Sequence, residues 1–291
     1  MVDSSRMTAS AFTLSGSLVG AGVGQAARWS LEDRARAAAE AGYAGIGMFE
    51  ADYAAMRAKG TPDAELVSVL DRHGMHVDEI EFLFDWAYDD ERRDAARSLS
   101  NNLYRMAEVF QPHRLNVGDV NPPDQLPDMS VVAARFGAIC DRVAPFGVNV
   151  AFEFLPWTGV PDIATAAEIV DRAGRQNAGI ILDVWHYFRG PSTIQQLRAL
   201  PPDKVVAVAL SDAGPASGDP VEDTTRRRLL PGEGTFALVE LLQELRDMQV
   251  SCPVSVEILS EHQATLRPDE AARTSYEAAL RVLREAGVAH N

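Results

Sequence analysis

Three carboxylates stand near the ends of apolar segments that have the length and composition of buried strands. Glu153 lies in VAFEFLPW, Asp183 in IILDVWH and Glu257 in VSVEILSE. If these side chains converge, they repel strongly, because two like charges about 4 Å apart repel by ~4 kcal/mol at an effective dielectric constant near 20. Convergence therefore requires either bound protons or a bound cation. Carboxylates suit Mg²⁺ or Mn²⁺, and an added imidazole extends the choice to Co²⁺ or Zn²⁺.

Each carboxylate also has a purely structural explanation. An acidic residue directly after a strand is often the N-cap of the next helix or a solvent-exposed side chain. His186, which follows Asp183 by three residues, is then an ordinary histidine in the first turn of a helix. The functional interpretation rests on the repetition of the pattern at three strand ends.

The elements that position these residues alternate between short apolar runs and longer segments of helical period, a pattern typical of βαβ units with a parallel sheet. Strands are predicted over residues 12–19, 43–49, 75–83, 113–118, 148–154, 179–183, 204–211 and 253–259. Helices are predicted over residues 30–41, 61–73, 90–110, 128–146, 162–174, 191–199, 234–248 and 268–286. This alternation predicts an α/β fold, a single (β/α)8 TIM barrel, with an open doubly wound sheet as the alternative. Reactive groups of such barrels lie at the C-terminal ends of the strands, where all three carboxylates fall.

Composition indicates an ordinary globular protein. The chain has 291 residues, 46% of them hydrophobic, and no apolar run approaches the length of a membrane span. We expect residues 1–11 to be a flexible lead without a signal peptide, and 12–291 to be one domain in the cytoplasm. The 27 basic and 42 acidic residues give a net charge of −15, which disfavours nucleic acid as a partner.

Five segments occur in an order that resembles the sugar phosphate isomerase/epimerase superfamily, the xylose-isomerase-like TIM barrels that include ketose 3-epimerases and inosose dehydratases. These segments are FEFLPW, ILDVWH, VALSDA, RLLPGEG and VSVEI. The resemblance implies that Glu153, Asp183 and Glu257 bind a metal, most often Mn²⁺ or Mg²⁺. It also implies that His186 and Arg228 contact the oxygens of a small-molecule substrate.

The chain departs from that pattern in VALSDA, where Ala209 stands at a position at which many relatives carry a histidine ligand. Alanine cannot coordinate a metal. Three alternatives follow: a metal with three protein ligands and water, a ligand shifted to Asp212 or His186, or a site without metal.

Four further residues are candidates for substrate contacts. Trp157 and Trp185 could form an apolar wall, although aromatic residues at strand ends also serve ordinary packing. Glu81 lies near the end of its predicted strand, where it is either an additional acid or base of the site or a solvated residue. Asn116 could bind a substrate hydroxyl.

The function we predict is a divalent-metal-dependent isomerase or epimerase that acts on a sugar-like or polyhydroxy-ketone substrate through an enediolate. Glu153 and Glu257 would transfer the proton on opposite faces, with His186 as a third catalytic residue. A lyase, either a dehydratase or a retro-aldolase, is the alternative with the same site, and a metal-free binding protein is the second alternative. Ala209 and the aromatic residues favour a substrate less polar than a simple sugar. The sequence leaves open whether the chain forms a homo-oligomer.

Overall fold

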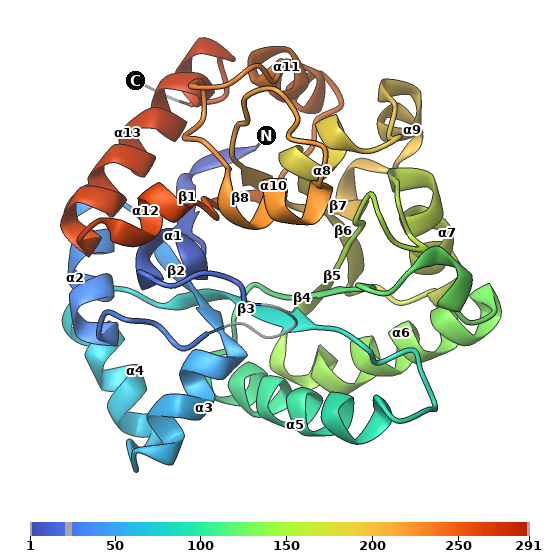
Figure 1. Cartoon of the computed structure of the whole chain (residues 1–291), viewed down its shortest axis with the longest axis horizontal. Helices are drawn as coiled ribbons and strands as arrows, with labels where there is room; N and C mark the ends of the chain where they lie inside the picture. Colours follow the sequence, from blue (N-terminus) through green and yellow to red (C-terminus); the bar gives the residue numbers. More distant parts are fainter. Residues whose placement is uncertain (1, 21–24, 290–291) are drawn as a thin grey trace.

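Eight parallel strands form a closed barrel in the computed structural model, which describes residues 2–20 and 25–289. Each strand pairs with its neighbours in chain order, and β8 closes the barrel on β1 (Figure 1). The strands are β1 (Asp3–Ala9), β2 (Gly45–Phe49), β3 (Val77–Leu83), β4 (Arg114–Gly118), β5 (Asn149–Glu153), β6 (Ala178–Asp183), β7 (Val205–Leu210) and β8 (Pro253–Val256). The predicted (β/α)8 barrel is thus confirmed, and the open sheet is excluded.

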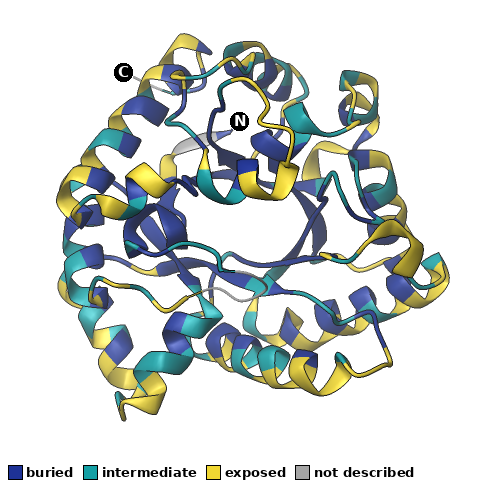
Figure 2. Cartoon of the chain, in the orientation of Figure 1, coloured by how far each residue is buried: buried dark blue, intermediate teal, exposed yellow. Residues whose placement is uncertain are grey.

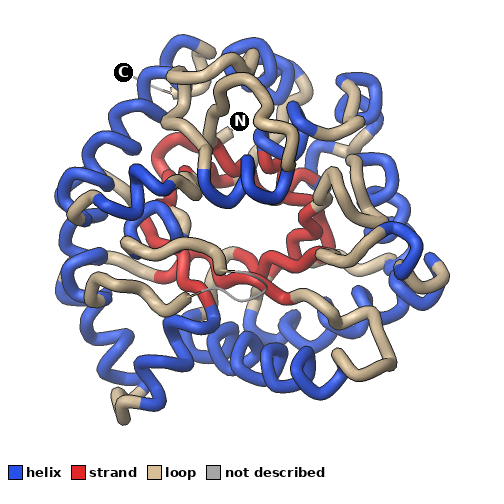
Figure 3. Tube along the Cα trace, in the orientation of Figure 1, coloured by secondary structure: helices blue, strands red, loops and turns tan. Residues whose placement is uncertain are grey.

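Helices surround the ring of strands and separate it from solvent (Figure 3). They are α1 (Ala11–Ser15), α2 (Leu31–Ala41), α3 (Glu50–Ala58), α4 (Asp63–Arg72), α5 (Arg93–Phe110), α6 (Met129–Val143), α7 (Ile163–Ala173), α8 (Val184–Arg189), α9 (Ile194–Ala199), α10 (Pro220–Arg226), α11 (Leu238–Asp247), α12 (Glu261–Thr265) and α13 (Pro268–Glu285). The outer helices bury one face and expose the other (Figure 2), as the helical period of their apolar residues requires. Among the described residues, no helix is both long and apolar enough to cross a membrane.

The first strand lies earlier in the chain than we predicted. Residues 12–19 do not form a strand; the apolar run there begins in α1, whose residues are all buried. The strand is β1, formed by residues we expected to be a flexible lead, and it pairs with both β2 and β8. A short apolar run does not distinguish a strand from a buried helix. The polar β1 sequence DSSRMTA gave no apolar pattern to correct the error.

The barrel interior contains a buried arginine that the sequence analysis did not identify. Arg114 of β4 is fully buried, forms an ion pair with Glu79 of β3, and donates from Nη2 to Ser255 Oγ of β8 at 2.9 Å. Its Nε also donates to Asn116 Oδ1 at 3.0 Å. Because a buried charge is costly without a partner, this cation and the carboxylate of Glu79 depend on each other.

We predict that Arg114→Met lowers the free energy of unfolding by about 3–5 kcal/mol, since it leaves the buried Glu79 without its cation. Urea denaturation followed by circular dichroism measures the change. The double variant Arg114→Met/Glu79→Gln should be less destabilised than Arg114→Met alone. Arg36→Gln, which breaks exposed pairs with Glu40 and Asp269, should change the stability only slightly, because exposed ion pairs contribute little. A loss of that small size in Arg114→Met would contradict the interpretation.

Candidate functional site

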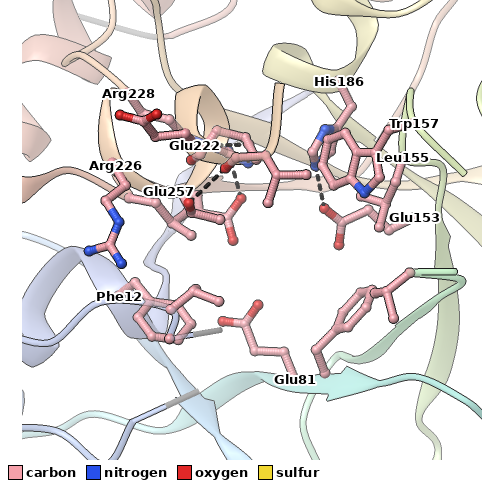
Figure 4. Close-up of a pocket in the computed structure, with 18 of the residues that line it drawn as sticks. Phe12, Glu81, Glu153, Leu155, Trp157, His186, Glu222, Arg226, Arg228 and Glu257 are labelled. Carbon is pink, nitrogen blue, oxygen red and sulfur yellow. Dashed lines mark hydrogen bonds and ion pairs between the residues drawn. The ribbon is translucent and has the colours of Figure 1, made fainter. Parts of the chain in front are cut away.

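A cavity of about 700 Å³ lies at the C-terminal ends of the strands, within the size range of small-molecule sites. Its lining includes Glu81 of β3, Glu153 of β5, His186 of α8, Arg228 after α10 and Glu257 after β8 (Figure 4). All five residues are at least nine-tenths buried. Two of the three predicted acidic strand ends, Glu153 and Glu257, therefore line one cavity together with a histidine and an arginine, while Asp183 is fully buried and does not line it.

Asp183 fits both explanations that the sequence left open, because it caps a helix and also binds a charged residue of the cavity. It is the N-cap of α8, and its Oδ1 accepts from the backbone N–H groups of Trp185 at 2.7 Å and His186 at 3.1 Å. Its Oδ2 accepts from Arg228 Nη1 at 2.8 Å. Burial of Asp183 raises the pKa of its carboxyl, but the charges of Arg228 and His186 outweigh burial and hold the pKa below its usual range.

Arg228 connects two of the predicted carboxylates. Its Nη1 donates to Asp183 Oδ2 and to Glu257 Oε2, each at 2.8 Å. Thr224 of α10 holds the other side of the guanidinium, since its Oγ1 accepts from Nη2 at 2.9 Å and its backbone oxygen accepts from Nε at 3.1 Å. The guanidinium also lies 5.8 Å from the ring centroid of Trp185, within the range of a cation–π contact. Arg228 is thus a fixed positive charge at the wall of the cavity.

A second pair of carboxylates meets at a serine. Ser10 Oγ lies 3.2 Å from Glu81 Oε1 and 3.4 Å from Glu257 Oε1. Burial and the nearby charge of Glu153 raise the pKa of Glu81 to about 7. Burial also raises the pKa of Glu257 well above its ordinary value, against the opposing effect of Arg228. This part of the site therefore takes up protons to limit the repulsion among its carboxylates.

On the other side of the cavity, Glu153, Asp183 and His186 form a group that could hold a metal ion. Glu153 Oε1 lies 3.1 Å from His186 Nε2, and Asp183 Oδ2 lies 3.8 Å from the same nitrogen. Among the described residues, this is the group of three possible ligands whose donor atoms all lie within 4.8 Å of one another. Two oxygens and an imidazole nitrogen at these separations fit one transition-metal ion with ligand distances near 2.1 Å.

Glu257, which we predicted as the third metal ligand, is not in this group. Its Oε2 is bound to Arg228 and its Oε1 lies within hydrogen-bonding distance of Ser10. His186 stands in its place, because α8 starts directly after Asp183 and its first turn brings the imidazole beside the two carboxylates. Ala209 of β7 lies beside Asp183 in the sheet register and is buried in a small apolar cluster inside the barrel.

Two of the predicted substrate contacts line the cavity and two do not. Trp157 and Glu81 line it. Trp185 is fully buried behind it, with its ring edge-on to Trp157 and His186 at centroid distances of 6.4 and 5.4 Å. Asn116 does not line the cavity, because its side chain accepts from Arg114 in the barrel interior.

Helix α10 contributes several residues to the cavity wall and was not predicted from the sequence. Asp219 is the N-cap of this helix, with Oδ1 accepting from the backbone N–H of Val221 at 2.9 Å, and Pro220 is its first residue. An acidic N-cap followed by proline is a recognised helix start. The seven-residue helix was too short for a periodic pattern to reveal it. Ser10 and Phe12 were missed because the first strand was predicted over residues 12–19, whereas Ser10 directly follows β1 and Phe12 lies in α1.

A barrel of eight strands with ionisable side chains gathered at the C-terminal ends is the architecture of a TIM-barrel enzyme. The chain belongs to the family described as Xylose isomerase-like TIM barrel, whose model matches residues 35–286. The predicted superfamily is thereby confirmed.

Among curated proteins, the chain is similar to an inosose isomerase of Halalkalibacterium halodurans, with 32% identity over 142 residues, 48% of this chain and 49% of the relative. It is also similar to a 3-dehydroshikimate dehydratase of Pseudomonas aeruginosa, with 27% identity over 47% of this chain and 22% of the relative. The chain thus spans about half or less of the length of the curated relatives it matches.

Solved structures share the fold over almost the whole chain. The crystal structure of IOLI protein with a bound zinc atom has a TM-score of 0.83 at 19% identity and covers 97% of this chain and 99% of its own. A xylose isomerase-like TIM barrel protein from Mycobacterium smegmatis in complex with magnesium has a TM-score of 0.70 at 15% identity, over 99% of this chain and 100% of its own. At these identities the likeness establishes the fold alone.

The raised pKa of Glu81 predicts a pH-dependent stability. With a folded pKa of about 7 and an ordinary value of 4.5, the folded state keeps a proton that the unfolded state loses between these values. The contribution of this proton to the free energy of unfolding is therefore complete below about pH 4.5 and is lost as the pH rises through 7. Glu81→Gln should remove this dependence and be more stable than the wild type at pH 8 by about 1–3 kcal/mol.

Urea denaturation at several pH values with a chelator present tests this prediction. The control is Glu240→Gln, which changes an exposed carboxylate of α11 and should leave the pH profile of the wild type unchanged. Parallel profiles for Glu81→Gln and the wild type would show that Glu81 is not responsible.

Proposed function

We propose that this protein is an isomerase or epimerase that moves a proton next to the carbonyl group of a hydroxy-ketone substrate. The observation that carries the proposal is the unequal environment of two carboxylates on two sides of one cavity (Figure 4). Glu153 contacts His186, whereas Glu257 is bound to Arg228 and has a raised pKa. A carboxyl group that holds a proton is suited to act as an acid, and a carboxylate beside an imidazole on the other side of the cavity is suited to act as the base.

In the proposed reaction, Glu153 removes the proton from the carbon that bears the hydroxyl group. Oε1 of Glu153 contacts His186, and the other oxygen would accept the proton as the C–H bond breaks. The protonated carboxyl of Glu257 then donates its proton to carbon: to the opposite face of the same carbon in an epimerisation, or to the former carbonyl carbon in an isomerisation, in which the hydroxyl proton passes to the other oxygen. His186 and Arg228 would orient the substrate oxygens, and the charge of Arg228 would stabilise the negative charge that develops on them. Proton exchange with solvent returns both carboxyl groups to their starting states.

A divalent metal fits this proposal. Glu153, Asp183 and His186 would hold it, and their mixed oxygen and nitrogen donors suit Mn²⁺ or Zn²⁺ better than Mg²⁺. Such an ion supplies Lewis-acid polarisation of the carbonyl and hydroxyl oxygens.

A dehydratase is the second candidate, and the similarity to a 3-dehydroshikimate dehydratase favours it over other lyases. Removal of the same proton would then be followed by loss of a β-hydroxyl group as water. The two candidates are separated by product mass, because an isomerase conserves the mass of the substrate and a dehydratase reduces it by one water molecule.

We predict that Glu153→Gln lowers the rate of substrate proton exchange by about 10²-fold or more, because it removes the base, and that Glu257→Gln lowers the rate of product formation by a similar factor, because it removes the acid. The measurement is the incorporation of deuterium from D₂O into inosose or 3-dehydroshikimate, followed by NMR, with mass spectrometry of the products. Thermal unfolding of each variant provides the folding control. Near-wild-type exchange in folded Glu153→Gln, or near-wild-type product formation in folded Glu257→Gln, would refute the assigned role of that residue.

We predict that titration with Mn²⁺ in a calorimeter shows one site, whose affinity falls by about tenfold or more in His186→Gln, since the imidazole is one of three protein ligands. Glu257→Gln is the matched control, because that carboxylate lies in the same cavity but outside the ligand group. It should retain the affinity within about threefold. The opposite ranking would identify Glu257 as a ligand in place of His186.

A further inference from the structure

Much of the cavity wall is apolar, in contrast to the carboxylates of Glu81, Glu153 and Glu257 that also line the cavity. Aromatic and aliphatic side chains make up much of the lining; they include Phe12, Phe49, Phe82, Phe84, Leu155 and Trp157. Gly118 of β4 helps to shape this wall, since a Cβ there would lie 2.6 Å from Cζ of Phe82 and 2.9 Å from the backbone oxygen of Glu153. Apolar walls of this kind gain free energy by covering an apolar ligand surface. A fully hydroxylated sugar offers little such surface.

The mouth of the cavity carries a positive charge that the protein itself does not neutralise. The basic residues of the lining are His186, Arg226 and Arg228, and two of them are already paired with Glu153 or with Asp183 and Glu257. The guanidinium of Arg226, the last residue of α10, makes no hydrogen bond or ion pair within the described part of the chain. It lines the cavity and is partly buried.

Nearby acids at the mouth have other partners. Asp219 caps α10, with Oδ1 accepting from Val221 and Glu222 backbone N–H groups. Glu222 is paired with Arg227 at 2.6 Å. Arg226 is therefore a cation available to a ligand in an otherwise apolar and acidic cavity. Figure 4 shows it on the side of the cavity opposite Glu153.

We propose that the substrate carries an acidic group, a carboxylate or a phosphate, that Arg226 binds, and that an apolar body joins this group to the hydroxy-ketone end. The identity of the hydroxy-ketone end rests on the proposed function, whereas the acidic group and the apolar body rest on the lining of the cavity. Arg226 is then a residue that determines specificity. The guanidinium suits both acids because its donors match two oxygens of either group.

The test uses three probes with the same head and the same aromatic body: 2-hydroxyacetophenone, its 4-carboxylate and its 4-phosphate ester. Calorimetric titration of the wild type should give about 3- to 10-fold tighter binding of an acidic probe than of the neutral one, as expected for one partly exposed charge pair. Whichever acidic probe binds more tightly identifies the acid. Raising the salt concentration should reduce the preference.

Arg226→Gln should remove the preference for the acidic probes and leave the binding of the neutral probe unchanged. Arg227→Gln is the matched control, because it removes the same charge one residue away from an exposed side chain that does not line the cavity. It should keep the preference. Equal binding of all three probes by the wild type, or equal loss in both variants, would overturn the proposal.

Deuterium exchange with the same probes separates this inference from the proposed function. If the acidic probes bind more tightly through Arg226 but no probe exchanges its proton, the acid-binding inference stands and the proton-transfer function fails. If the neutral and acidic probes exchange with equal kcat/KM in the wild type and in Arg226→Gln, the function stands and the acid-binding inference fails.

Discussion

The two hydrogen bonds from one nitrogen of Arg228 to Asp183 and Glu257 are the interaction on which the site depends. The positive charge of Arg228 keeps Asp183 ionised beside Glu257, whose carboxyl holds a proton because burial raises its pKa. Arg228 is itself held by Thr224 of α10, and Asp183 is held by the N-terminus of α8. The arginine therefore joins the strand ends to two short helices, and the position of α10 at the mouth of the cavity follows from this attachment.

The remaining negative charge divides the cavity into two halves. Near Ser10, burial raises the pKa values of Glu81 and Glu257, so this half holds protons. Near α8, Glu153 and Asp183 stand beside the imidazole of His186, so this half is suited to a cation. One response to repulsion gives carboxyl groups that hold protons, and the other gives a group that could hold a positive charge. The proposed proton-transfer reaction would use both.

Much of the barrel and of its acidic rim could be predicted, because each depends on local features of the sequence. Apolar runs that end in Glu153 and Asp183 identified β5 and β6 within one residue at each end. The first strand could not be found, since Thr8 of β1 is a polar residue buried by a hydrogen bond to Asp78, 70 positions away. The sequence also did not reveal that His186, and not Glu257, lies close to both Glu153 and Asp183. This arrangement depends on where Arg228 lies in space, which no spacing of residues along the chain expresses.

Ala209 leaves β7 without a side chain that could bind an ion beside Asp183. Its side chain packs with Ala151, Ile181 and Ala207 inside the barrel, directly beside Asp183 in the register of β6 and β7. A methyl group there supplies neither a ligand nor a charge, so β7 contributes only packing next to the site. The imidazole of α8 and the guanidinium that follows α10 therefore approach Asp183 from outside the sheet. Because both depend on connections at the mouth of the barrel, the charged groups around Asp183 are tied to α8 and to the segment that carries Arg226.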